Sequence, residues 1–294
     1  MEIIKIIIET LINGLSVGST YAMIALGYTM VYGIAKMLNF AHGDVIMVGG
    51  YTMLVTMTAL GNPILGLIAA VIFCVILGVV IEKVAYKPLR GASPLAVLIT
   101  AIGVSYLLQS LAQIIFGTGT ETMTIMSFGN INIAGIVIPI HMIITLACSV
   151  VIMVGLSLFV KYTKTGRAMI AVSEDRGAAQ LMGINVNKII MITFAIGSAL
   201  AAFAIFFMAL KTVGLNNTLG AMPGIKAFTA AVIGGIGSIP GAMLGGLLMG
   251  IVEVIASKIP AIAPYTDAIE FAVLIIILLV RPSGILGKKR REKV

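Results

Sequence analysis

The chain has 294 residues, of which 60% are hydrophobic and only 10% are charged, and its mean hydropathy is +1.16. A soluble globular protein is nearer half apolar, with about a quarter of its residues charged. This composition excludes a soluble enzyme or receptor domain and predicts that lipid is the solvent for most of the chain. In so apolar a chain, the net charge of +8 is explained by basic residues in cytoplasmic loops and does not indicate nucleic-acid binding.

Twelve of the 19 basic residues gather in three clusters, which the positive-inside rule places in the cytoplasm. The clusters are Lys83, Lys87 and Arg90; Lys161, Lys164, Arg167 and Arg176; and Lys288, Lys289, Arg290, Arg291 and Lys293. By contrast, the stretch 117–138 contains no lysine or arginine, and Glu121 is its one charged residue. We expect that stretch on the external side.

The first half of the chain contains five apolar stretches, each near the ~20 residues that a helix needs to cross a bilayer. We place these spans at about 10–34, 40–60, 63–83, 94–116 and 139–160. Because no small-residue cleavage site follows Glu2, Lys5 and Glu9, the N-terminus is interpreted as the start of a spanning helix. Gly61-Asn62-Pro63 is typical of a turn that opens a helix.

The second half begins with one long polar segment, 161–188, and is less regular after it. Further spans are expected at about 189–210, 240–257 and 265–281, whereas 223–238 is too short for a full crossing. The sequence thus predicts an all-α polytopic membrane protein of about eight helices, some short or broken, with the N-terminus outside and the C-terminus cytoplasmic. We expect a single transmembrane domain, 1–294.

Glycines are frequent inside these spans. Gly14 and Gly18 are four residues apart, as are Gly246 and Gly250, which is a spacing that favours close helix packing in lipid. The denser group Gly234, Gly235 and Gly237 would interrupt a helix. These three glycines either serve packing only or lie at a cavity or mobile joint of a translocation path.

The stretch KMLNFAHGD (36–44) puts polar residues between two apolar spans. Asn39 is a good N-cap for the second span, and Asp44 suits the positive end of that helix. Alternatively, Asn39, His42 and Asp44 line the path or an inner gate, where a break between helices meets the substrate.

Several catalytic patterns are absent from the sequence. It contains no P-loop, no H-E-x-x-H, no C-x-x-C and no G-x-S-x-G, and its two cysteines and two histidines form no metal spacing. We therefore expect no metal, no cofactor and no enzyme activity, and favour movement of a solute across the membrane.

The polar segment 161–188 contains EDRGAAQLMGINV, in which two alanines precede a glycine. Alanines on a short helix offer a shallow face to another protein, and the glycine permits the chain to turn back. An ordinary cytoplasmic loop is the alternative. The candidate docking residues are Gly166, Arg167, Glu174, Asp175, Ala178, Ala179 and Gly183.

This segment resembles the coupling loop of ABC importer permeases, whose pattern is E-A-A, three residues and G, although Gly177 replaces the glutamate. Longer stretches resemble the LivH-type permeases of the branched-chain amino acid ABC importer family, in the same order over nearly the whole chain. They are GLSVGSTYAMIALGYTMVYGIAKMLNFAHGD (14–44), TGRAMIAVSEDRGAAQLMGI (165–184), GIKAFTAAVIGGIGSIPGAMLGGLLMGIVE (224–253) and VRPSGILGKK (280–289).

The resemblance implies an inner-membrane permease subunit that moves branched-chain amino acids by alternating access. It implies a second related permease, the same or different, two cytoplasmic ABC ATPases, and a periplasmic or lipid-anchored substrate-binding protein. Apart from membrane lipid, no other partner and no nucleic acid is expected.

Three alternatives stay open at this point. The permease could carry another small solute, such as urea or an amide. A stand-alone channel or secondary transporter would need buried ionisable residues as a relay, for which Glu253 and Glu270 are the candidates. A membrane assembly or receptor subunit would have no passage at all.

Overall fold

The computed structural model describes residues 2–126, 128–133 and 136–287. The C-terminal basic cluster, which begins at Lys288, lies outside these residues. The helices are α1 (Glu2–Ala35), α2 (His42–Leu60), α3 (Pro63–Ile81), η1 (Glu82–Tyr86), η2 (Lys87–Leu89), α4 (Pro94–Phe116), α5 (Ile140–Tyr162), α6 (Lys164–Glu174), α7 (Arg176–Leu181), α8 (Val186–Ala209), α9 (Ala221–Gly234), α10 (Ile239–Lys258), η3 (Ala263–Tyr265) and α11 (Thr266–Val280).

Four short strands complete the described part of the chain. They are β1 (Glu121–Met123), β2 (Asn130–Ile133), β3 (Ile136–Pro139) and β4 (Val213–Leu215). β1 pairs with β4, and β2 pairs with β3, both antiparallel. The sequence predicted none of these strands, because three or four residues are too few to show a clear alternation of apolar and polar side chains.

Seven helical segments of the described residues are long and apolar enough to cross a membrane. They are His42–Leu60, Pro63–Leu89, Pro94–Phe116, Ile140–Tyr162, Val186–Ala209, Ile239–Lys258 and Ala263–Val280. These segments confirm seven of the predicted spans and the all-α polytopic class. The predicted first span, 10–34, falls within α1, whose 34 residues extend over about 51 Å.

The starts of three helices follow from their capping residues. The Asn62 side chain accepts the Ile64 N–H at 2.9 Å, directly before Pro63 at the start of α3. Ser93 accepts the Ala96 N–H at 3.3 Å before Pro94, and Ser238 accepts the Gly241 N–H at 3.2 Å before Pro240. The turn predicted at Gly61-Asn62-Pro63 is confirmed, since Gly61 ends α2 with φ of +64°.

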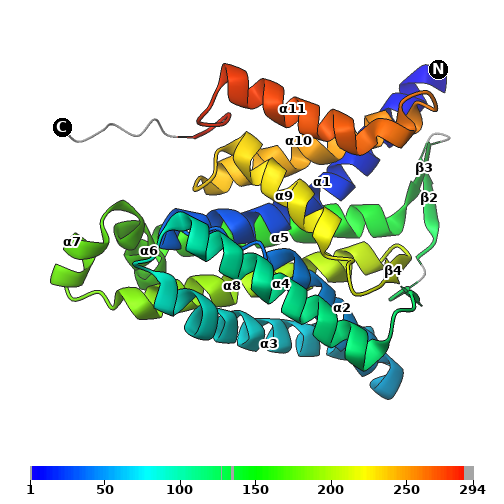
Figure 1. The fold of residues 1–294 in the computed structure, drawn as a ribbon. Helices are drawn as coiled ribbons and strands as arrows, with labels where there is room; N and C mark the ends of the chain where they lie inside the picture. The colour runs from blue at the N-terminus through cyan, green and yellow to red at the C-terminus, as the bar shows by residue number, and fades with distance from the viewer. Residues whose placement is uncertain (1, 127, 134–135, 288–294) are drawn as a thin grey trace. The chain divides into compact units, whose positions relative to one another are not determined.

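The chain divides into two compact units. Unit 2 comprises Met30–Ser127 and Gly155–Ile225. In it α2, α3 and α8 pack against one another, and α6 and α7 lie at the end opposite β4 (Figure 1). Near β4, the buried side chains of Met47, Tyr51, Ala112 and Leu215 form a cluster.

Unit 1 comprises the described residues of Met1–Thr29, Phe128–Val154 and Lys226–Val294. Glycines bring α1 and α10 into close contact. A Cβ atom at Gly18 would lie 2.8 Å from the Leu247 Cα, and one at Gly246 would overlap the backbone of Ala22. The packing role predicted for Gly18, Gly246 and Gly250 is confirmed, because side chains there would force the two backbones apart.

The helix interruption predicted at Gly234, Gly235 and Gly237 is also present in unit 1. α9 is only 14 residues long and ends at Gly234, and α10 begins five residues later at Ile239. Gly235 and Gly237, with φ of +107° and +94°, form the turn between them. Because both residues adopt left-handed conformations, a β-carbon at either position would strain the turn.

Candidate functional site

The polar stretch between α1 and α2 is an irregular, mostly buried segment of unit 2. α1 ends at Ala35, and Lys36 has a left-handed backbone with φ of +52°. The Lys36 ammonium donates to the Gly33 carbonyl at 2.6 Å, which satisfies one carbonyl at the end of the helix. Buried irregular backbone of this kind is tolerated in a membrane protein only where protein or water covers it.

The predicted capping role of Asn39 is wrong. α2 begins at His42, its N-cap is Ala41, and no side chain caps it. Asn39 lies three residues before the helix, and its side-chain oxygen instead accepts the Tyr86 hydroxyl at 2.9 Å. The first-turn placement of Asp44 is confirmed.

Asp44 lies well inside unit 2, and not at one of its ends. The Gln109 amide of α4 donates to the Asp44 carboxylate at 2.9 Å, about 22 Å along α4 from its start. The thiol of Cys74, about 16 Å along α3, is 3.5 Å from the Val45 carbonyl. The start of α2 therefore lies opposite the middle of α3.

Close backbone contact holds the start of α2 in this position. A Cβ atom at Gly43 would overlap Gly220, and one at Gly220 would overlap Gly43. His42 and Asp44, on either side of Gly43, are only 1% and 2% exposed. The segment that precedes α9 thus packs directly against the first turn of α2.

A second polar cluster lies where α3 continues into the π-helical turn η1. The Arg90 guanidinium binds the Glu82 carboxylate and the Asn187 side-chain oxygen. The Glu82 side chain is only 2% exposed, so this ion pair is shielded from solvent. Arg90 therefore links the end of α3 to the start of α8.

The predicted coupling residues of 161–188 form two short helices beside α8. Thr163 caps α6 by accepting the Gly166 N–H at 3.0 Å. A Cβ atom at Gly166 would overlap Phe159 and Val160, so this glycine lets α6 pack against the end of α5. Arg167 and Glu174 are exposed on α6.

α7 carries the alanine pair and ends at a glycine turn. Asp175 caps α7 by accepting the Ala178 N–H at 3.0 Å, so the structure assigns it a local role that the sequence did not predict. Ala178 is exposed and Ala179 is buried, which makes only one of the two alanines available to a partner. Gly183 turns the chain with φ of +80°, as predicted.

Arg176 joins the coupling segment to the end of α1. Its guanidinium donates to the Ala35 carbonyl, one residue before the polar stretch begins. Burial, and to a lesser degree the positive charge of Arg90, lower the pKa of Arg176 below its ordinary value. An arginine remains charged despite such a shift, so a partly desolvated cation caps the carbonyl end of α1.

Three glycines of the predicted path, Gly234, Gly235 and Gly237, belong to unit 1. The chain segment 284–287 packs on them: the Leu286 N–H donates to the Gly234 carbonyl at 2.9 Å, and a Cβ atom at Gly235 would lie 2.7 Å from the Gly287 Cα. The structure thus shows close backbone packing at these glycines.

A charged cluster in unit 1 joins α9, α10 and α11. The Lys226 ammonium lies 2.8 Å from Asp267, 3.1 Å from Glu253 and 3.4 Å from Glu270. Glu253 and Glu270 are the two residues that a secondary transporter would need as a relay, and both are ion-paired with Lys226.

The sequence did not indicate Tyr86 and Gln109, which bind Asn39 and Asp44. Gln109 is a polar residue inside the predicted span 94–116, but nothing in the sequence near either residue indicates its partner. Glu82 was a detectable signal, since a carboxylate inside an apolar stretch needs a partner. Nothing local indicated which residue that partner would be.

Comparison with known proteins identifies the family. Residues 10–278 match the family described as "Branched-chain amino acid transport system / permease component". The chain is 44% identical to the high-affinity branched-chain amino acid transport system permease protein BraD of Pseudomonas aeruginosa, over 98% of both chains. It is 40% identical to LivH of Escherichia coli K12, covering 98% of this chain and 97% of that protein.

A more distant relative is the ribose import permease protein RbsC of Haemophilus influenzae, 27% identical over 96% of this chain and 87% of that protein. Permease components of ABC-type systems work with ATPase and substrate-binding partners and are not themselves enzymes. With its apolar spanning helices, this is a multi-pass protein of the inner membrane. The chain belongs to the permease components of branched-chain amino acid transport systems.

Proposed function

We propose that this permease carries branched-chain aliphatic amino acids into the cell by alternating access. Its partners would be a second related permease, two cytoplasmic ABC ATPases, and a periplasmic or lipid-anchored binding protein that delivers the substrate. The near full-length identity of 40–44% to permeases named for these amino acids is the observation that carries the proposal. The whole chain, 1–294, would act as a single transmembrane domain with the coupling loop 161–188.

The charge distribution of unit 2 supports an orientation with α6 and α7 in the cytoplasm. Lys83, Lys87, Arg90 and Lys188 line one small cavity at that end, and α6 adds Lys164 and Arg167. The positive-inside rule assigns such an end to the cytoplasm. Near β1 and β4 at the opposite end, Lys211 is the one basic residue between 205 and 215.

This orientation, with the N-terminus outside and the C-terminus inside, needs an odd number of passes through the membrane. Eight spans would put both termini on one side. The proposed orientation therefore requires a ninth pass, which α9 would supply as a short segment entering from the external side, with α10 returning after the turn at Gly235.

The contacts of α7 support a coupling mechanism. The ATPases would grip α6 and α7 through Arg167, Glu174, Ala178 and the turn at Gly183. Their ATP-driven closure favours one state only if they contact the two states of the permease differently. Arg176 would pass the movement on, since it binds the end of α1 directly.

The gate would lie at the break between α1 and α2. A zwitterionic substrate loses water from two charged groups, and exposed helix ends and buried polar groups replace part of it. Asn39, His42 and Asp44 would form this part of the path, and the turn at Gly234, Gly235 and Gly237 would be its second moving part.

Reconstitution tests the proposal. The complete complex in proteoliposomes, with its binding protein, is expected to accumulate labelled leucine when ATP is supplied. The permease pair without ATPases should take up none, even with an ion gradient. Uptake of ribose or urea in place of leucine would refute the proposed substrate class, and gradient-driven uptake without ATPases would refute the ABC mechanism.

A further inference from the structure

A small cavity in unit 1 is lined by α1, β3 and the facing ends of α5 and α10. Its volume is about 200 Å³, which is the space of a few water molecules at about 30 Å³ each and suits one small solute. Its lining includes no residue of the polar stretch 36–44 and none of the coupling segment 161–188. The lining residues are Glu9, Ile12, Asn13, Val137, Ile138, Pro139, Met142 and Lys258.

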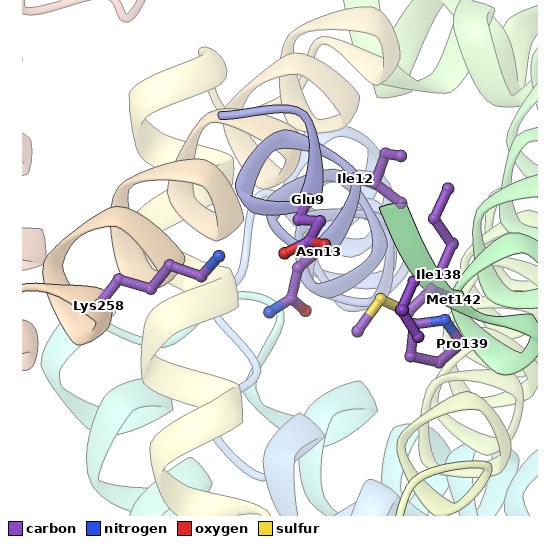
Figure 2. Close-up of a pocket in the computed structure, with 8 residues that line it drawn as sticks. Glu9, Ile12, Asn13, Ile138, Pro139, Met142 and Lys258 are labelled. Carbon is purple, nitrogen blue, oxygen red and sulfur yellow. The ribbon is translucent and has the colours of Figure 1, made fainter. Parts of the chain in front are cut away.

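The polar groups of the cavity carry both signs of charge. Glu9 and Asn13 come from α1, and Lys258 reaches toward them from the end of α10 (Figure 2). The Lys258 ammonium donates to the Thr10 hydroxyl at 2.8 Å, which fixes its position. Within the described ranges no ion pair joins Lys258 to Glu9, so each charge is able to bind a ligand group of opposite sign.

The opposite side of the cavity is aliphatic. Ile12, Ile138, Pro139 and Met142 lie together there, across from the Lys258 ammonium (Figure 2). Ile138 is only 8% exposed, so this wall is part of the packed structure. Pockets that bind small molecules typically combine such an apolar wall with a few polar groups that fix orientation.

We infer that this cavity is an outer subsite for a zwitterionic aliphatic amino acid. Lys258 binds the carboxylate, Glu9 binds the ammonium, and Asn13 offers a hydrogen bond to either group. The aliphatic side chain lies against Ile138 and Met142. The inference rests on the proposed function, in which the N-terminal end of α1 faces the side from which the binding protein delivers substrate.

Ligands that lack one charge test the inference. The complete complex in nanodiscs, without its binding protein, is expected to bind leucine more tightly than 4-methylpentanoate, which lacks the ammonium, or 3-methylbutylamine, which lacks the carboxylate. Equilibrium dialysis measures the three affinities. Glu9→Gln should lower the affinity for leucine about tenfold and leave the affinity for 4-methylpentanoate unchanged. Lys258→Gln should lower the affinity for leucine similarly and leave the affinity for 3-methylbutylamine unchanged.

A matched control separates charge from structure. Lys5→Gln removes a charge from the same end of α1 but outside the cavity. This variant should bind leucine within about twofold of the unaltered chain. A misfolded variant would lose all three ligands, whereas the inferred site predicts that one ligand is retained.

The result that overturns the inference is leucine affinity unaffected by both charge variants, or no binding of leucine by the unaltered complex. Displacement of leucine by phosphatidylethanolamine added to the nanodiscs would instead assign the cavity to a lipid headgroup. ATP-driven leucine uptake with the binding protein is measured in parallel. If uptake persists without binding at the cavity, only the subsite fails; if uptake is absent, the proposed function fails.

Discussion

Asn39 and Tyr86 are 47 residues apart in the chain, and a hydrogen bond of 2.9 Å joins them in unit 2. Asparagine before an apolar stretch is a good sequence signal for a helix cap, and here that signal was misleading. The chain continues in irregular form to Ala41, so Asn39 is too far from the helix to cap it. A buried amide must then find another partner, and Tyr86 provides it.

Tyr86→Phe tests this pair. Removing the hydroxyl leaves the buried Asn39 oxygen without its donor, which should destabilise the protein by about 1–3 kcal/mol. Asn39→Ala should act through the same bond, so the double variant is expected to be no less stable than the worse single variant. Thermal unfolding of the purified permease measures both. Additive losses would show that the two side chains act independently.

His42 and Asp44 carry the prediction about the gate. Alanine at either position should lower the maximal rate of leucine uptake about tenfold or more and leave the affinity for the binding protein unchanged. The uptake rate should fall because both side chains belong to the proposed gate. The affinity for the binding protein should not change because both side chains are buried inside unit 2, away from its surface. Uptake kinetics and binding-protein titration give the two values. Unaltered uptake in both variants would mean that these residues serve packing only.

Gly183 illustrates a residue whose role the sequence did predict. Its φ of +80° requires a residue that tolerates the left-handed region, and no atom lies within 4 Å of a Cβ built there. Conformation, and not space, therefore decides which residues are accepted at this position.

Gly183→Val and Gly183→Asn should thus differ. Valine is strained at positive φ, whereas asparagine adopts this conformation at small cost. We expect valine to reduce ATP-dependent uptake at least about fivefold and asparagine to retain most of it, with equal amounts inserted in the membrane. Equal uptake by the two variants would count against the role of the turn in coupling.

At the scale of elements, the two ends of helix α7 have different surroundings. Leu181 and Met182 are 90% and 82% exposed where it ends, and Arg176 binds the end of α1 where it begins. A six-residue helix is not stable by itself, so it depends on the Asp175 cap and on packing against α8. We therefore expect α7 to move together with the elements that it contacts.

Arg176→Gln should break the contact between α7 and the end of α1 but leave the proposed ATPase docking surface intact. Losing the charged cap of α1 is expected to lower uptake at least about fivefold, while the ATPases still co-purify and still hydrolyse ATP. Lys188→Gln is the matched control, because it removes a nearby positive charge whose side chain makes no hydrogen bond to α1 among the described residues. Loss of the ATPases from the Arg176 variant would move this residue to the docking surface instead.

At the scale of the whole molecule, the orientation in the membrane is the property on which the other proposals depend. The chain has two native cysteines, Cys74 and Cys148. Replacing both by serine permits a single new thiol to report the side of the membrane on which it lies. Thr120 and Gln180, both exposed and at opposite ends of unit 2, are suitable positions.

Thr120→Cys and Gln180→Cys should respond in opposite ways to a membrane-impermeant maleimide. In intact cells the reagent should label the first and not the second, and after permeabilisation it should label both. Labelling of Gln180→Cys in intact cells would show that the orientation is the reverse of the proposed one. The coupling mechanism and the outer position of the subsite would then both be wrong.

Hydropathy is a local property of sequence, which explains why the spans from 94 to 116 and from 240 to 257 agree closely with α4 and α10. Lipid requires about 20 apolar residues in a row, and no distant residue changes that requirement. The glycine turns at Gly61 and Gly183 are local in the same sense. Membrane class, helix positions and family resemblance were therefore readable from the sequence alone.

Only the tertiary structure decided which polar groups meet. The bonds of Arg176 to Ala35, Tyr86 to Asn39 and Gln109 to Asp44 each join residues far apart in the chain. A polar side chain in an apolar helix indicates that a partner is needed, but which residue is the partner depends on how the helices pack and rotate. That packing is set by many weak contacts between small and apolar side chains, whose sum no single stretch of sequence determines.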